Sequence, residues 1–239
     1  MVVSFAEKVV LVAGGTGGLG KAVALAFLQE QAKVVVTYRN EGEFAALQAS
    51  AGERARALVG HAVDVTDEEA SAQLVKNILS QHGRLDVLVN TVGGYVGGVS
   101  LWKLETKVFD RMLALNLRSG YSLARAVLPA MLAQQHGAIV NVAAKAAVDH
   151  GGGASAYAAS KAASVALMDS LAADTKGTGV RVNSILPSII DTAVNRQAMP
   201  GAAFDQWPKP EDIAKVILFL CSDLAKVVHG ASIPVYGDS

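Results

Sequence analysis

The sequence lacks the features that mark several broad classes of protein. Its single cysteine, Cys221, excludes an intrachain disulfide and lies in an apolar stretch of helical length, which favours a buried, unreactive thiol. The 21 basic and 21 acidic residues cancel and form no long block of one sign, so we expect no surface for nucleic acid or an anionic membrane. No apolar run approaches a membrane span, and Glu7 and Lys8 interrupt the one near the start, which argues against a signal peptide. We therefore expect a cytoplasmic protein that acts on a small molecule.

Histidine content and length set two further limits. The histidines show no ligand spacing, so we expect no metal site; they are His61, His82, His136, His150 and His229. A chain of 239 residues suits one large α/β domain and leaves no room for a second catalytic domain.

Short apolar runs alternate with longer segments of helical pattern along the whole chain. The predicted strands are Val9–Ala13, Lys33–Tyr38, Leu58–Val65, Leu85–Asn90, Ala138–Ala143, Val180–Leu186 and Ser232–Val235. The predicted helices are Leu19–Gln31, Glu43–Ala51, Asp67–Gln81, Lys103–Ala133, Ser155–Lys176 and Pro210–Ser222. This alternation predicts a single-domain, Rossmann-type, doubly wound fold over residues 1–239, with about seven parallel strands and helices on both faces of the sheet. The loop-rich segment 187–210 is expected to be a substrate lid.

A glycine-rich turn joins the first predicted strand to the first predicted helix. Glycines at Gly14, Gly18 and Gly20 let the backbone turn tightly and approach a pyrophosphate at the helix N-terminus, where free amides favour anions. Thr16 and Leu19 lie in the same turn and are included in the predicted cofactor site. The string alone is a weak signal, but its place between strand and helix favours dinucleotide binding.

The end of the second predicted strand bears on the choice of dinucleotide. NAD-binding proteins usually place an acidic residue here to hold the ribose hydroxyls, whereas NADP-binding proteins offer arginine. The strand ends in Arg39 and Asn40, with no carboxylate before Glu41. The sequence therefore favours NADP(H) over NAD(H). Arg39 could also be a solvated side chain, or stack on adenine without meeting a phosphate.

Tyr157 and Lys161 form the candidate catalytic pair. A spacing of four places both side chains on one helical face, where the ammonium of Lys161 is expected to lower the pKa of the Tyr157 phenol. The alternative is an ordinary surface pair on an amphipathic helix. Thirteen residues before the tyrosine stands Ala144, which has no hydroxyl group.

With these motifs in order, the whole chain resembles the short-chain dehydrogenase/reductase family. The glycine turn and the Tyr157–Lys161 pair match its cofactor and catalytic motifs. Further matches are Asp64 and Val65 for the adenine contact, Asn90 after the fourth strand, Asn116 on a helix, and Pro187, Ile190 and Thr192 near the carboxamide, with Ser188 in place of glycine. The resemblance implies that Lys161 also holds the nicotinamide ribose and that Asn116 anchors a proton-relay water. It also implies a homodimer or homotetramer, through the helices around 116–133 and 155–176.

The main departure from that family is the missing serine at Ala144. In the family this serine donates to the substrate carbonyl oxygen, and loss of such a donor commonly costs ~10² to 10³ in rate. Ser155 is a weak substitute, and Ser160 is expected to face elsewhere. Either the catalytic activity of the chain is therefore impaired, or its substrate needs less stabilisation by a hydrogen-bond donor.

A narrower resemblance favours a substrate that does not need the serine hydroxyl. The segments around 93–98, 144–149 and 186–207 resemble the branch of quinonoid dihydropteridine reductase, which also lacks the serine. Tyr95, between glycine pairs, is a candidate to stack on a flat bicyclic ring, or simply a loop aromatic that shields the core. The sequence thus predicts hydride transfer from NAD(P)H to an activated acceptor such as a quinonoid dihydropteridine. The alternatives are a carbonyl (ketone or 3-oxoacyl) reductase and a catalytically silent nucleotide-binding regulator.

Overall fold

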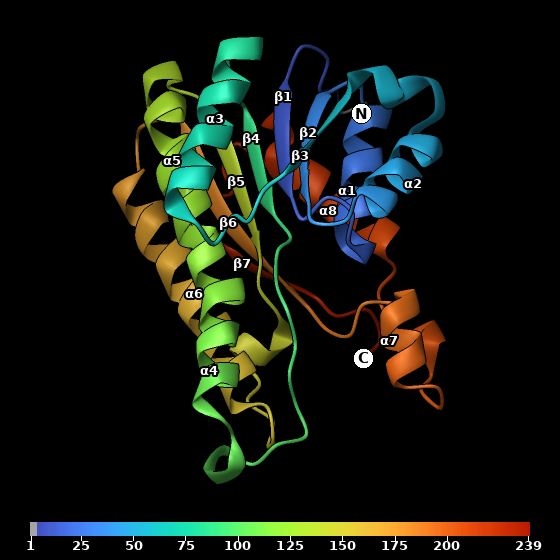
Figure 1. Cartoon of the computed structure of the whole chain (residues 1–239). Coiled ribbons are helices and arrows are strands. Elements are labelled where there is room, and N and C mark those ends of the chain that lie inside the picture. Colours follow the sequence, from blue (N-terminus) through green and yellow to red (C-terminus); the bar gives the residue numbers. More distant parts are fainter. Residues whose placement is uncertain (1–3) are drawn as a thin grey trace.

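The computed structural model describes residues 4–239, which form one seven-stranded sheet between two layers of helices (Figure 1). The strands are β1 (Val9–Ala13), β2 (Lys33–Tyr38), β3 (Leu58–Ala62), β4 (Val87–Asn90), β5 (Gly137–Val142), β6 (Val180–Pro187) and β7 (Ser232–Val235). They lie in the order β3-β2-β1-β4-β5-β6-β7, and every pairing is parallel. The order reverses between β1 and β4, and ligands of such sheets bind at this switch point, outside the carboxyl ends of the strands.

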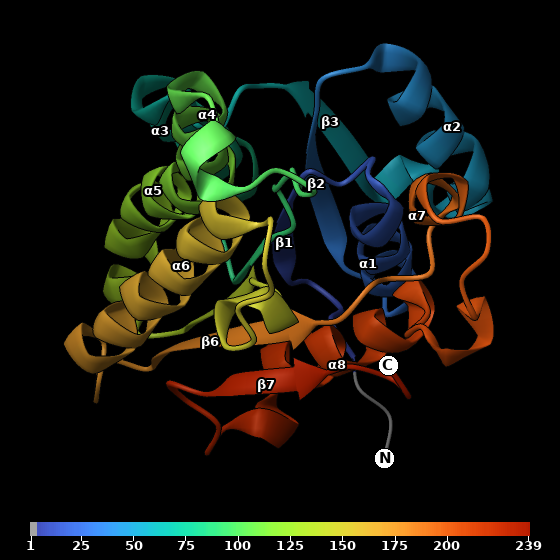
Figure 2. The same ribbon diagram turned by 90° about the horizontal axis from the view of Figure 1, so that it is seen from below.

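The helices divide between the two faces of the sheet (Figures 1 and 2). One face carries α1 (Gly18–Gln29), α2 (Glu41–Ala51) and α8 (Pro210–Cys221), and the other carries α3 (Glu68–His82), α4 (Thr106–Leu113), α5 (Ser119–Gln134) and α6 (Ser155–Asp174). Each layer closes over its own apolar core: Phe27 and Ile217 lie in the first, and Leu88 and Val127 in the second. Because both faces are covered, the strands are apolar almost throughout, as the sequence pattern indicates.

Short helical turns and one short helix complete the chain. The turns are η1 (Gly52–Ala57), η2 (Leu101–Lys103), η3 (Ala114–Arg118, a π-helical turn), η4 (Lys145–Ala147), η5 (Phe204–Gln206) and η6 (Asp223–Ala225). The short helix α7 (Ala193–Ala198) lies beyond the carboxyl edge of the sheet, over the start of α1 (Figure 2). Within the described residues 4–239, no helix is both long and apolar enough to cross a membrane.

The predicted fold is confirmed, and the differences are local. The third strand stops at Ala62 rather than Val65, because Asp64 accepts hydrogen bonds from the backbone and hydroxyl of Thr66 in a turn. The helix predicted over Lys103–Ala133 is found as a continuous helical run that begins with α4 at Thr106, passes through the π-helical turn η3 and ends with α5, while η2 is a separate turn. The π-helical turn interrupts the regular pattern, and such turns often occur at functional sites.

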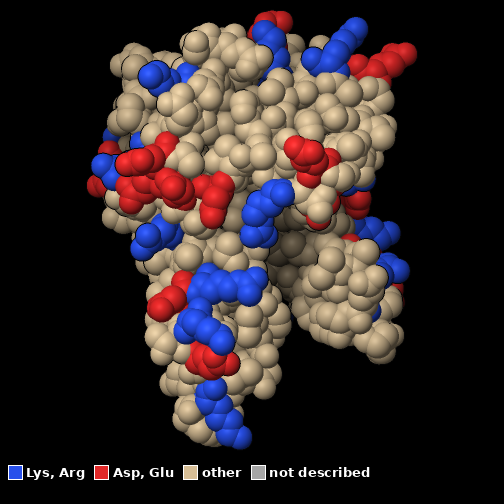
Figure 3. Space-filling model, viewed as in Figure 1, with Lys and Arg blue, Asp and Glu red and all other residues tan. Residues whose placement is uncertain are grey.

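The carboxyl edge of the sheet opens into a hollow. Figure 3 shows the surface hollowed between the lobe that carries α4 and the lobe that carries α7. The loops after β1, β4 and β5 all end at this edge, because parallel strands present their carboxyl ends on the same side.

Candidate active site

The glycine turn after β1 is packed as closely as a phosphate-binding turn requires. Gly14 has φ +75°, and a Cβ on Gly20 would lie 2.1 Å from the Gly14 carbonyl oxygen. The first turn of α1 has no side-chain cap and no acidic residue, whereas α2 and α3 have both. Its amides are therefore free for an anion. The Leu19 side chain lies in the core, so only its backbone amide is available to a ligand.

The lid segment touches this turn. A Cβ on Gly18 would lie 2.7 Å from the Cγ2 of Thr192, which caps α7 by accepting from the Asn195 amide. Pro187 ends β6, and Ile190 packs partly buried against the core under α1. The glycine turn fits the phosphates of a dinucleotide, because its glycines leave no side chain in front of the uncapped amides of α1. Whether 187–210 moves as a lid stays a prediction.

The end of the candidate cofactor site beside β2 and β3 carries an acidic residue, Glu43, that the sequence pattern does not single out. Arg39 is exposed at the end of β2, and Val65 is buried after β3. The pKa of Asp64 is lowered, first by its hydrogen bonds from Thr66 and also by the charge of Arg39. Glu43, in the first turn of α2, accepts a hydrogen bond of 2.9 Å from the Thr16 hydroxyl. In the sequence Glu43 reads only as part of a helix start, three residues after the cap Asn40.

Tyr157 and Lys161 lie on the first turns of α6, with Lys161 only 5% exposed. The Lys161 ammonium donates 2.8 Å to the carbonyl oxygen of Val142, at the end of β5. Complete burial lowers the pKa of Lys161 to about 8. Burial, together with the like charge of Tyr95, raises the pKa of Tyr157 to about 12. The expected lowering of the Tyr157 pKa by Lys161 is therefore wrong in this conformation, because burial dominates and the ammonium is directed to the strand end.

Asn116 fixes the loop after β4 against α6. It lies in the π-helical turn η3, where its side-chain amide accepts from the Gly94 N–H at 2.9 Å and donates to the Gly94 carbonyl at 3.0 Å. The same amide donates 2.9 Å to the hydroxyl of Ser160, which itself donates to the Tyr157 carbonyl. Ser160 is fully buried in this network, a role that its place between the two candidate catalytic residues did not reveal. A Cβ on Gly93 would lie 2.8 Å from Asn116 Oδ1 and 3.2 Å from Lys161 Nζ, so only glycine fits there.

Asn90 is buried at the end of β4, and its side chain does not face the cleft. Its amide donates to Asn141 on β5, and Asn141 donates in turn to Ser164 on α6. Its oxygen accepts from the Val92 amide, which holds the start of the loop. Only the backbone around Asn90 is thus placed to contact a cofactor; the side chain positions the loop. Asn141 and Ser164 were not predicted, because a lone polar residue in an apolar strand or helix has no distinctive spacing.

The position of the missing serine is well defined. Ala144 follows β5 in extended conformation and is 6% exposed, so the strand end presents a methyl group where a hydroxyl is expected. Ser155 begins α6, and its hydroxyl is buried without a hydrogen-bond partner among residues 4–239. Its use as a substitute donor stays a prediction.

Tyr95 places a second phenol in contact with Tyr157. Its ring meets the Tyr157 ring edge to face, with centroids 4.9 Å apart and planes at 81°. It is 67% exposed, so it does not shield the core.

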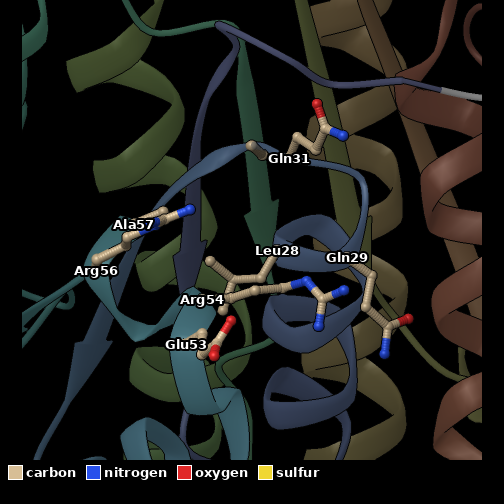
Figure 4. A pocket seen from close by; sticks show the side chains of 8 residues that line it. Leu28, Gln29, Gln31, Glu53, Arg54, Arg56 and Ala57 are labelled. Carbon is tan, nitrogen blue, oxygen red and sulfur yellow. The ribbon is translucent and has the colours of Figure 1, made fainter.

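A separate hollow of about 490 Å³ lies at the opposite edge of the sheet (Figure 4). It opens between the end of α1 and η1, before β2 and β3 begin, and its charged lining residues Glu53, Arg54 and Arg56 are exposed. It shares no residue with the catalytic pair.

Comparison with known proteins identifies the family. The family model for short chain dehydrogenases matches residues 8–202. A 3-oxoacyl-acyl-carrier-protein reductase of Thermotoga maritima is 30% identical over 96% of both chains, and a D-threitol dehydrogenase of Mycolicibacterium smegmatis is 34% identical over 96% of this chain and 92% of its own. The solved structure of ElxO with NADP bound is 27% identical, with a TM-score of 0.91 over 96% of this chain and 97% of that one. None of these is a dihydropteridine reductase. The chain belongs to the short-chain dehydrogenase family and is an NAD(P)-dependent oxidoreductase.

Proposed function

We propose that the protein is an NADPH-dependent carbonyl reductase. The observation that carries this proposal is the placement of Tyr157 and the buried Lys161 on the first turns of α6, with the Lys161 ammonium bonded to the end of β5. A phenol is protonated at neutral pH and can give its proton to a carbonyl oxygen that is being reduced. The names of the relatives, a 3-oxoacyl reductase and a polyol dehydrogenase, support carbonyl and hydroxyl chemistry over pterin chemistry.

The bound nicotinamide would supply the hydride. Lys161 would bind the nicotinamide ribose, and the free amides at Gly18–Gly20 the pyrophosphate. As hydride reaches the carbonyl carbon, the C=O π pair moves to oxygen and takes the proton from the Tyr157 hydroxyl. The Asn116–Ser160 network would hold Tyr157 in place by its backbone. The phenolate left behind would recover a proton from solvent.

A second candidate remains, because Ala144 favours it. An activated acceptor such as a quinonoid dihydropteridine takes hydride onto an electron-poor ring and builds charge on nitrogen. It therefore makes less use of a carbonyl-directed hydroxyl, and the methyl group of Ala144 would cost such a substrate little.

For the cofactor we propose NADP(H), with a modest preference. Arg39 offers an exposed guanidinium for an adenosine phosphate. Glu43 opposes it, because its carboxylate is held 2.9 Å from the Thr16 hydroxyl in the cofactor turn. The positive charge of Arg39 would attract the adenosine phosphate of NADP(H), whereas the negative charge of Glu43 would repel it.

The decisive test is NADPH consumption against a panel of acceptors. The panel contains small ketones, a 3-oxoacyl thioester and a quinonoid dihydropteridine. We expect ketone or thioester reduction, lost by about 10² or more in Tyr157→Phe, with NADPH affinity unchanged by fluorescence titration. Tyr121→Phe, on α5, is the matched control. Rapid turnover of the pterin alone would select the second candidate. No turnover of any acceptor, with NADPH still bound, would identify a silent nucleotide-binding protein.

A further inference from the structure

With a methyl group at Ala144, the proposed carbonyl site lacks the usual second donor beside Tyr157; Ser155, at the start of α6, is a competing candidate because its buried hydroxyl has no hydrogen-bond partner among residues 4–239. Reduction of a carbonyl builds negative charge on oxygen, and a second donor usually holds that charge. The neighbouring hydroxyls of Ser160 and Ser164 are both directed at backbone carbonyls of α6. Tyr95 is the other phenol in contact with Tyr157.

The loop after β4 is shaped to hold the Tyr95 phenol. At its start, Gly94 is fixed by both hydrogen bonds to Asn116. At its far side, a Cβ on Gly97 would lie 2.0 Å from the Tyr95 hydroxyl oxygen and 2.5 Å from Cζ. Gly97 has no positive φ, so its backbone would accept an alanine, and the space for the phenol is the physical reason for glycine.

The two phenols are also electrostatically coupled. The like charge of Tyr95 contributes, after burial, to the raised pKa of Tyr157, in keeping with the contact between the two rings. Tyr95 is 67% exposed, and its ring lies 4.9 Å from the Tyr157 ring, centroid to centroid. A carbonyl oxygen bound at Tyr157 would therefore lie close to an exposed second phenol.

We propose that the Tyr95 hydroxyl donates to the substrate oxygen the hydrogen bond that Ala144 cannot donate. This rests on the carbonyl reductase function proposed above. Tyr157 transfers its proton, whereas Tyr95 keeps its own and stabilises the developing oxyanion. Gly97 is then a positioning residue, because its lack of a side chain leaves the space that the Tyr95 phenol occupies.

The test is Tyr95→Phe, which keeps the ring and removes the hydroxyl. We expect kcat for the preferred carbonyl substrate to fall by about 10², with KM and NADPH affinity changed less than about threefold. Ala144→Ser in the Tyr95→Phe background should recover kcat by at least about tenfold. Gly97→Ala should lower kcat similarly, without a further loss when combined with Tyr95→Phe. Gly98→Ala, at φ +78° with no atom near its Cβ, separates displacement of the phenol from strain in the loop.

A second measurement does not depend on turnover. In protein labelled with ¹³C at tyrosine Cζ, Tyr95→Phe should lower the pKa of Tyr157, because a like charge is removed. An unchanged Tyr157 titration would overturn the coupling of the two phenols.

The outcomes separate the two proposals. A wild-type enzyme that reduces no carbonyl removes the proposed function, and with it the role of Tyr95. A fast wild-type enzyme with an equally fast Tyr95→Phe variant overturns the Tyr95 proposal alone; slow turnover in Tyr95→Ala would then identify stacking by the ring. A slow Tyr95→Phe variant that Ala144→Ser does not rescue would also overturn it.

Discussion

Replacing Lys161 by methionine should stabilise the fold while abolishing turnover. Lys161 is 5% exposed, and its one hydrogen bond is to the Val142 carbonyl. Burial lowers its pKa from 10.5 to about 8. A difference of about 2.5 corresponds to roughly 3 kcal/mol of unfavourable free energy at pH 7, because the folded state must hold a charge that it disfavours. Methionine has similar length and carries no charge.

Part of this gain is offset by the hydrogen bond that the variant loses. The Val142 carbonyl would lose its charged donor, which costs about 1 to 2 kcal/mol. The net expectation is a variant more stable by about 1 to 2 kcal/mol at pH 7, or roughly 2 to 8 °C in Tm for a chain of this length. Urea unfolding at fixed protein concentration is the appropriate assay, because an oligomer's stability depends on concentration.

The pH dependence is the sharper part of this prediction. Because the folded pKa lies below the unfolded value, the cost is fully present below pH 8 and is relieved as the pH rises from about 8 to 10.5. The stability of Lys161→Met relative to wild type should therefore fall by roughly 2.5 kcal/mol between pH 7 and pH 10, so that the variant becomes the less stable protein by about 0.5 to 1.5 kcal/mol at pH 10. Lys176→Met, at an exposed lysine just beyond α6, is the control and should change stability by less than about 0.5 kcal/mol at either pH. A Lys161→Met variant that is less stable by the same amount at both pH values would refute the reasoning.

The remaining predictions concern the cofactor, the buried network, the pH profile and assembly. Arg39→Ala should weaken the binding of NADPH about tenfold and that of NADH little, whereas Glu43→Gln should strengthen NADPH binding about three- to fivefold. Both affinities are measured by titration, with Arg54→Ala as the control. Equal changes in the affinities for NADPH and NADH would contradict this prediction. Ser160→Ala leaves a buried amide hydrogen of Asn116 unpaired, so unfolding experiments should show a loss of about 1 to 3 kcal/mol; an unchanged midpoint would contradict the network. Initial rates of reduction should fall as the pH rises through about 8, as the buried lysine loses its proton; a flat profile to pH 10 would show that its charge is not needed. Light scattering should show a homodimer or homotetramer, and a monomer at micromolar concentration would remove that expectation.

The sequence predicts the fold well because the signals are long and repeated. Continuous apolar strands alternate with helices over the whole chain, and β1, β2 and β7 match the predicted bounds. The long helix predicted over 103–133 begins only at Thr106, and it contains a π-helical turn at Asn116, whose side chain bonds the distant loop at Gly94. Apolar periodicity reflects local conformational preference, so it cannot reveal a hydrogen bond between residues that are 22 positions apart in the sequence.

The candidate site is predictable only where function and local pattern coincide. The glycine turn and the Tyr157–Lys161 spacing are local, so the sequence indicates both. The Thr16–Glu43 hydrogen bond and the contact of Tyr95 with Tyr157 join separate loops and depend on the fold. The pKa expectation is wrong for the same reason: spacing places both residues on one helical face, but the Lys161 ammonium bonds the Val142 carbonyl and burial raises the pKa of Tyr157.

The division of the site into buried and exposed parts explains how it could work on a carbonyl without the serine. The polar chain from Asn90 through Asn141 to Ser164, and that from Gly94 through Asn116 to Ser160, are both buried and bonded within the fold. Such networks fix the groups that must not move, here the backbone of Tyr157 and the start of the loop after β4. The missing hydroxyl belonged to this rigid part, at the end of β5. Tyr95 instead offers its hydroxyl from an exposed loop, so the orientation of the second donor would depend on the contact with Gly97 and on the substrate itself. If this is so, discrimination between substrates should be more sensitive to the loop 93–98 than to substitutions at Ala144.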